Sequence, residues 1–238
     1  MNHPTRVREQ RTGGRTPMVW MYHSISEVEH DPYRVTVSPG RFGRQLRWLA
    51  KHGLRGRAMR EAYTSGGRVA LTFDDGYADF IEEAVPILAE FGFTATVFVL
   101  PGMLGGVNEW DPGGPVKRLM TADQIRAAAA AGMEIASHGM RHHPLPSLGD
   151  GQLVEEVAAS RALLAELTGA EIDGFAYPYG AFDERCRRAV EDAGYRYACA
   201  VRGPQRPGRH AVPRRFIGET DNAFRLRCKH FLHTWRTR

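Results

Sequence analysis

The chain has 238 residues, of which 42% are hydrophobic and 25% are charged, and these proportions exclude a disordered or collagen-like protein. The 32 basic residues exceed the 27 acidic ones by five, and no segment approaches the roughly 18 consecutive apolar residues of a membrane span. A chain of this length buries enough surface to fold without disulfides. Its three cysteines, Cys186, Cys199 and Cys228, are too scattered for a disulfide framework, so we predict free thiols.

The amino terminus differs in composition from the rest of the chain. Residues 1–16 contain four arginines and no apolar run, which predicts a disordered basic arm in front of one domain over residues 17–238. Because the arm lacks the apolar region of a signal peptide, we expect a cytoplasmic protein. The arginine-rich ends are the one feature that favours nucleic-acid binding, and no recognition motif accompanies them. We therefore predict no nucleic-acid partner and no membrane partner.

Apolar runs and helical patterns alternate from residue 18 onward. The apolar runs predict strands over residues 18–22, 69–73, 93–100, 133–137, 175–177, 195–201 and 214–217. Capping residues and apolar periodicity predict helices over residues 39–52, 80–91, 122–131 and 150–168, and one through Cys186 and Val190 that ends at Gly194. Residues 101–115 contain five glycines and three prolines, which predicts a long loop.

This alternation predicts parallel strands joined by crossover helices. Two architectures fit it, a closed barrel and an open doubly wound sheet. No internal repeat or low-complexity linker divides the chain, so we expect a single domain. In either architecture the ligand site lies at the carboxyl ends of the strands, and the polar residues there are the candidates for chemistry.

Two groups of polar residues follow predicted strands. Asp74 and Asp75 come directly after one strand, and adjacent buried carboxylates need a cation or hydrogen-bond donors. His138 follows another strand, and His142 stands four residues later, which would place both imidazoles on one side of a helical turn. That spacing is typical of a shared Zn²⁺ and favours His142 over its neighbour His143. A carboxylate with two imidazoles leaves positions open for water and substrate, as in a catalytic site.

These residues resemble a known family. The segments TFDDG (residues 72–76), SHGMRH (residues 137–142) and YPYG (residues 177–180) are similar to the first three motifs of the polysaccharide deacetylases, which are NodB-homology carbohydrate esterases. The resemblance covers residues 69–201, and the YHS string at residues 22–24 resembles the start of bacterial exopolysaccharide deacetylases of this group. The fold that it implies is a distorted (β/α)7 TIM-like barrel, which agrees with the alternation.

The resemblance also implies a role for each site residue. Asp75, His138 and His142 would bind a divalent metal, and Asp74 would be the general base. The backbone N–H of Tyr179 would donate to the oxyanion, together with the metal. Zn²⁺ is the expected ion, although Co²⁺, Ni²⁺ or Fe²⁺ suits the same donors. The expected substrate is an N-acetylated saccharide, which would be hydrolysed to acetate and a free amino sugar.

Three departures from the family pattern concern the catalytic machinery. Ala176 stands where the third motif usually begins with an arginine that orients the base, and no Asp-Trp motif is visible after Tyr195. No Leu-x-His motif supplies a general acid. His23 is the preferred acid because it ends the first strand and strand ends of a barrel converge, while His230 and His233 are alternatives in the tail.

The leading functional hypothesis is a metal-dependent N-deacetylase of a polysaccharide, an oligosaccharide or a small glycoconjugate. One alternative is an O-deacetylase or another amidohydrolase with the same metal site. Another is a carbohydrate-binding relic without turnover, which Ala176 and the absent acid motif would explain. Trp110 and Tyr179 could stack on a sugar ring, and for Trp110 ordinary loop packing is an equal alternative.

Overall fold

The computed structural model describes residues 17–65, 69–201 and 208–236, so the predicted arm lies outside the described residues. The strands are β1 (Met18–Tyr22), β2 (Ser24–Ile25), β3 (Thr36–Val37), β4 (Gly56–Arg57), β5 (Val69–Phe73), β6 (Thr96–Val99), β7 (Glu134–Ser137), β8 (Gly174–Ala176), β9 (Tyr197–Ala200), β10 (Val212–Pro213) and β11 (Arg215–Phe216). The α-helices are α1 (Pro39–Lys51), α2 (Met59–Ser65), α3 (Val85–Glu90), α4 (Ala122–Ala130), α5 (Asp150–Val154), α6 (Ser160–Thr168), α7 (Glu184–Asp192) and α8 (Ala223–Arg236). Two π-helices, Phe80–Ala84 and Glu155–Ala159, precede α3 and α6. No described helix has the length and apolar character that crossing a membrane requires.

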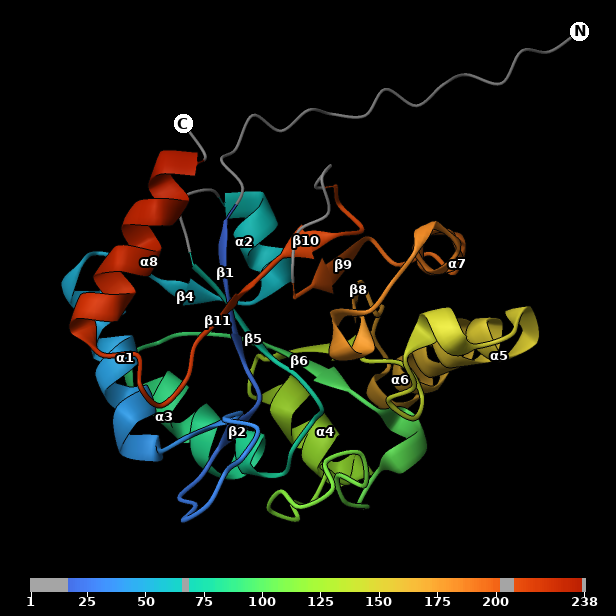
Figure 1. Cartoon of the computed structure of the whole chain (residues 1–238), viewed down its shortest axis with the longest axis horizontal. Coiled ribbons are helices and arrows are strands. Elements are labelled where there is room, and N and C mark those ends of the chain that lie inside the picture. Colours follow the sequence, from blue (N-terminus) through green and yellow to red (C-terminus); the bar gives the residue numbers. More distant parts are fainter. Residues whose placement is uncertain (1–16, 66–68, 202–207, 237–238) are drawn as a thin grey trace, which may run out of the picture.

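The main sheet is parallel throughout and curls into a nearly closed barrel with the helices around it (Figure 1). Its strands follow the order β10-β9-β8-β7-β6-β5-β1-β11, and β4 pairs with β5 beside them. One extended segment, residues 212–216, joins the two ends of this order, because β10 pairs with β9 and β11 pairs with β1. Of the two architectures that the sequence left open, the structure is therefore the barrel, and the open doubly wound sheet is wrong.

Alternate residues of the strands pack on opposite faces of the barrel wall. In β1, Trp20 and Tyr22 belong to the large apolar cluster between strands and helices, while Val19 belongs to a smaller cluster with Phe98 and Ala176. The smaller cluster fills the barrel interior, as the two-residue period of a strand requires. Small residues of this cluster, such as Ala136 and Ala176, leave space for the larger ring of Phe98.

The local signals in the sequence locate most elements correctly. Ser38 caps α1 through its side chain, and Thr121 with Gln124 forms the predicted capping box of α4. The predicted strands and helices over residues 18–201 are present; those over residues 18–22, 69–73 and 150–168 have the predicted bounds, and most of the others are shorter. Sequence reasoning did not identify the short strands β2, β3, β4 and β10 or the helices α2 and α8, and only the short strand at residues 214–217 was predicted in the tail. The tail carries few uninterrupted apolar runs, so its structure depends on packing against the barrel.

Candidate active site

The carboxyl ends of the strands bring the candidate residues into one cavity of about 290 Å³. His23 follows β1, Asp74 and Asp75 follow β5, and His138 follows β7. The register pairs Tyr22 with Phe73, which puts His23 level with Asp74. The cavity is lined by His23, Tyr33, Val35, Asp74, Asp75, Trp110, Asp111, His138, His142, Tyr177, Tyr179, Gly180 and Val201.

Asp75, His138 and His142 lie together as the sequence predicted. The Nε2 atoms of His138 and His142 are 3.3 Å and 3.4 Å from Oδ1 of Asp75. All three side chains are buried, and their potential ligand atoms lie within 4.8 Å of one another. Among the described residues, this is the one group of three or more His, Cys, Asp or Glu residues arranged so that it could hold a metal ion.

The donor set fits a divalent ion of the zinc type. Ligand atoms at about 2.0–2.1 Å from a tetrahedral ion stand about 3.3–3.4 Å apart, which matches the distances between Asp75 and the two imidazoles. Nδ1 of His138 lies 2.8 Å from the carbonyl oxygen of Ala176. An Nδ1–H that donates to a carbonyl leaves the Nε2 lone pair for a metal, and this partner is typical of metal-ligating histidines.

The electrostatics of the three residues agree with this fit. Burial by itself would raise the pKa of Asp75, but its contact with His138 and the charges of both imidazoles hold that pKa well below its usual range. Burial lowers the pKa of His142 to about 4, and the neighbouring His138 acts in the same direction. His142 is therefore neutral at pH 7, which is the form that binds metals.

Asp74 pairs with an arginine, whereas Asp75 contacts the two imidazoles. Nη1 of Arg214 is 2.6 Å from Oδ1 of Asp74, and Nη2 is 2.7 Å from Oδ2. The Arg214 side chain is fully buried, lies over the ring of Phe98 at 5.3 Å, and also donates to the Thr72 hydroxyl at 3.3 Å. Burial would raise the pKa of Asp74, but the Arg214 guanidinium brings it below its ordinary value. Asp74 is therefore an oriented carboxylate at neutral pH.

Arg214 makes the contact with Asp74 that the resemblance assigns to the arginine of the third motif. Ala176 is buried in the apolar cluster of the barrel interior, which also includes Phe98. The Arg214 guanidinium lies over the ring of Phe98. Arg214 sits between β10 and β11, in the segment that joins the two ends of the sheet. The sequence offered no signal for this choice, since it contains many arginines and this one is separated from Asp74 by 140 positions.

The prediction that His138 and His142 share a helical turn is wrong. Residues 139–143 form a loop, in which Gly139 has φ of +83° and His142 has φ of +63°. Asp75 and Tyr179 also have positive φ, at 72° and 58°. Four described non-glycine residues have a positive φ, and three of them, Asp75, His142 and Tyr179, line the cavity. This conformation costs about 1–2 kcal/mol per residue, and such strain typically clusters at functional sites.

Of the remaining candidate histidines, His23 lines the cavity and the others do not. His23 lines the cavity, with Nε2 4.0 Å from Oδ2 of Asp74. His143 points elsewhere, because its Nδ1 lies 2.9 Å from Oε1 of Glu156. His230 lies on α8 with its ring 6.2 Å from that of Trp48, and neither His230 nor His233 is among the described residues that line the cavity. Of the three histidines weighed as general acid, the cavity therefore contains only His23.

Two aromatic side chains flank the imidazole of His142. The rings of Trp110 and Tyr179 each lie 4.4 Å from the His142 ring, and both residues line the cavity. Tyr179 is 55% exposed, so much of its ring faces solvent. Trp110 packs on the ring of His142, as the loop-packing interpretation predicts, and it also lines the cavity, while sugar stacking stays a prediction.

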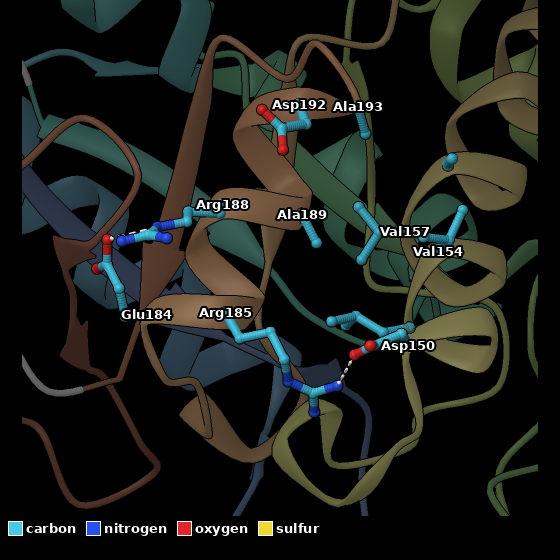
Figure 2. A pocket seen from close by; sticks show the side chains of 11 residues that line it. Asp150, Val154, Val157, Glu184, Arg185, Arg188, Ala189, Asp192 and Ala193 are labelled. Carbon is cyan, nitrogen blue, oxygen red and sulfur yellow. Dashed lines mark hydrogen bonds and ion pairs between the residues drawn. The ribbon is translucent and has the colours of Figure 1, made fainter.

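A larger pocket of about 600 Å³ lies between α5 and α7 (Figure 2), and none of its lining residues belongs to the first cavity. Its floor includes Val157 and Ala189, and its rim carries the ion pair of Arg185 with Asp150 at 2.8 Å. The lining contains no histidine or cysteine. The side chains suited to catalysis are concentrated in the smaller cavity.

A parallel barrel with a carboxylate and two imidazoles at the carboxyl ends of its strands defines a class of barrel proteins with a candidate metal centre. Within that class, the chain belongs to the polysaccharide deacetylase family, whose sequence model matches residues 61–198. The polysaccharide deacetylase motifs noted in the sequence lie within that range.

Individual relatives share moderate identity with this chain. The Bacillus subtilis protein YxkH, named as a polysaccharide deacetylase, is 29% identical over 74% of this chain. The aligned part covers 61% of that relative, so the chain spans less than two thirds of its length. A poly-beta-1,6-N-acetyl-D-glucosamine N-deacetylase of Staphylococcus aureus is 22% identical over 91% of this chain and 76% of its own length.

Solved structures confirm the fold. The Streptococcus pyogenes deacetylase PplD, in complex with acetate, superposes with a TM-score of 0.76 at 21% identity, over 90% of this chain and 97% of that one. IcaB from Ammonifex degensii superposes with a TM-score of 0.75 at 24% identity, over 94% and 98% of the two chains. The predicted (β/α)7-type barrel is therefore correct.

Proposed function

We propose that the chain is a metal-dependent hydrolase that removes N-acetyl groups from an N-acetylated saccharide. The observation that carries this proposal is the convergence of Asp75, His138 and His142 in the cavity that also contains the Asp74–Arg214 pair. The name of the Staphylococcus aureus relatives, N-deacetylases of poly-beta-1,6-N-acetyl-D-glucosamine, supports an N-acetylated sugar as the substrate class.

Asp75, His138 and His142 would hold the ion, for which Zn²⁺ is the first choice and Co²⁺, Ni²⁺ or Fe²⁺ suits the same donors. When bound, a divalent ion supplies Lewis acidity toward the acetyl carbonyl and the attacking water. With only these three ligands from the protein, the ion would remain accessible to water and substrate.

The proton transfers are assigned to Asp74 and His23. Asp74 accepts a proton from the water that attacks the acetyl carbon, and its pairing with Arg214 fixes the direction of its oxygens. His23, on the same side of the cavity, donates a proton to the sugar nitrogen as the C–N bond breaks. The products are acetate and a free amine. The backbone N–H of Tyr179 donates to the oxyanion that forms during this step.

The cavity lining supports an uncharged sugar. None of the described residues that line it is a lysine or an arginine, whereas Asp74, Asp75 and Asp111 bring three carboxylates. An anionic group on the sugar would therefore find no lysine or arginine among the lining residues to pair with. Trp110 and Tyr179 offer aromatic faces that suit the axial C–H groups of a hexose ring.

An acetate-release assay tests the proposed function. Chelator-treated protein would be incubated with N-acetylglucosamine oligomers, with and without added Zn²⁺ or Co²⁺, and both acetate and free amine would be measured. We expect the two products in equal amounts and only with metal. Acetate from O-acetylated sugars without any amine would instead identify an O-deacetylase. Oligomer binding without acetate from metal-loaded protein would identify the binding relic.

A further inference from the structure

The loop that carries His142 is attached to a single buried carboxylate. Glu156 is 5% exposed, and its Oε2 accepts hydrogen bonds from the backbone N–H groups of Met140 at 2.6 Å and Arg141 at 3.2 Å. The Nδ1–H of His143 donates to its Oε1 at 2.9 Å. These donors lie immediately before and after His142, so one side chain fixes both sides of that residue.

The close approach of the loop to Glu156 requires a glycine. A Cβ on Gly139 would lie 2.8 Å from Oε2 of Glu156, and the φ of +83° at this position favours glycine independently. On its other side the loop is held by the N–H of Gly102, which donates to the carbonyl of Met140 at 3.1 Å. The loop is therefore fixed between Glu156 and the end of β6.

An unusual helical turn places Glu156 under the loop. It belongs to the π-helix Glu155–Ala159, where Glu155 is exposed while Glu156 and Val157 are both buried. Single π-turns inside α-helices occur frequently at functional sites. The next residue of the same helical stretch after the π-turn, Ser160, contacts the hydroxyl of Ser137 at 2.8 Å, directly before His138. One continuous helical segment thus contacts the backbone or side chains next to both imidazoles.

We propose that Glu156 is a positioning residue for the metal centre and holds residues 139–143 in the conformation that directs the His142 imidazole at Asp75. The inference rests on the proposed function, because it concerns the same ion. His142 has a left-handed backbone, a state that needs external support to persist. Glu156 accepts three hydrogen bonds from residues next to His142, and none of these three comes from a metal-ligand residue, so it acts through the loop.

Zn²⁺ titration of metal-free full-length protein by calorimetry tests this role. We expect Glu156→Ala to weaken Zn²⁺ binding roughly 10- to 100-fold, as loss of an outer partner of a ligand typically does. Glu156→Gln retains one oxygen for the backbone donors and should weaken it roughly three- to tenfold, because hydrogen bonds to charged acceptors are the stronger ones. The visible spectrum of bound Co²⁺, which reports ligand geometry, should change in both variants.

The matched control is Glu155→Ala, an exposed neighbour in the same π-helix, which should bind Zn²⁺ like the wild type. Wild-type Zn²⁺ affinity and an unchanged Co²⁺ spectrum in Glu156→Gln would overturn the inference while leaving the metal centre intact. If Glu156→Ala fails to fold, Glu156→Gln decides alone. Absence of Zn²⁺ binding by the wild type would overturn the proposed function itself, and this inference with it.

Discussion

The two ends of the barrel interior each bury a carboxylate, in opposite environments. At the carboxyl ends of the strands, Asp74 receives a two-pronged ion pair from Arg214 and borders an open cavity. At the amino ends, Glu134 accepts hydrogen bonds from the backbone N–H of Arg60 at 2.9 Å and from the hydroxyls of Thr96 at 2.7 Å and Tyr197 at 3.0 Å.

Their pKa values are shifted in opposite directions for this reason. Burial acts to raise the pKa of both groups, and the Arg214 guanidinium reverses this for Asp74. The donors around Glu134 are a backbone amide and two hydroxyls, and its pKa remains above the ordinary value. The comparison shows that burial alone does not set the direction in which the pKa of a carboxyl group shifts. The charge of its hydrogen-bond partner decides it.

The largest expected effects separate Asp74 from its neighbour Asp75. Asp74→Asn should keep metal content near wild type while kcat falls roughly 10²- to 10⁴-fold, the usual contribution of a positioned proton acceptor. Asp75→Asn should lose metal affinity, and excess metal should restore part of its activity. Metal stoichiometry and acetate-release kinetics on both variants provide the measurement. The assignment is wrong if Asp74→Asn loses the metal and Asp75→Asn retains it.

Removing the guanidinium should make the environment of Asp74 resemble that of Glu134. Arg214→Met leaves Asp74 buried without its cation, so we expect a loss of about 3–5 kcal/mol in unfolding free energy and a fall in kcat. Arg214→Lys keeps the charge but not the two-pronged geometry, and should lose less stability than Arg214→Met. Urea unfolding and acetate release measure the two effects. Wild-type kcat in Arg214→Met would show that Asp74 does not need this partner.

Placing an arginine at position 176, where the third motif of the family usually has one, tests whether Asp74 can be oriented from that position. Ala176→Arg alone should destabilise the barrel by about 1–3 kcal/mol, because its interior already contains Phe98 and the Arg214 side chain. In an Arg214→Ala background the added side chain has space, and we expect partial recovery of kcat. Thermal unfolding and acetate release on the single and double variants provide the comparison. A double variant no better than Arg214→Ala would mean that position 176 cannot orient Asp74 in this barrel.

The smallest expected effect concerns the pH dependence of stability through Glu134. Folding raises the pKa of Glu134. The stabilisation linked to this shift is fully present below the pKa of Glu134 in the unfolded chain, and it is lost as pH rises through the pKa in the folded protein. The amide in Glu134→Gln does not titrate. Between pH 4 and pH 8, the Tm of the wild type should therefore fall by about 2–4 °C relative to the Tm of the variant. Differential scanning calorimetry measures this difference. Glu90→Gln, at an exposed site, is the control. An equal Tm shift in that variant would show that burial of Glu134 is not the cause.

The sequence by itself determined the parts of this protein that depend on near neighbours. Apolar runs and the caps at Ser38 and Thr121 locate strands and helices, since such signals act within a few residues. Strand ends identified Asp74, Asp75 and His138 as candidates, because parallel strands must bring their carboxyl ends together.

Only the tertiary structure decided which distant residues complete the site. Arg214 reaches Asp74 because residues 212–216 join the two ends of the sheet, a contact across 140 positions that no local pattern encodes. The loop around His142 is not helical, because Glu156 and Gly139 allow a left-handed backbone that the four-residue spacing does not reveal. Backbone conformations of this kind are held by long-range packing, and that packing exists only once the barrel has formed.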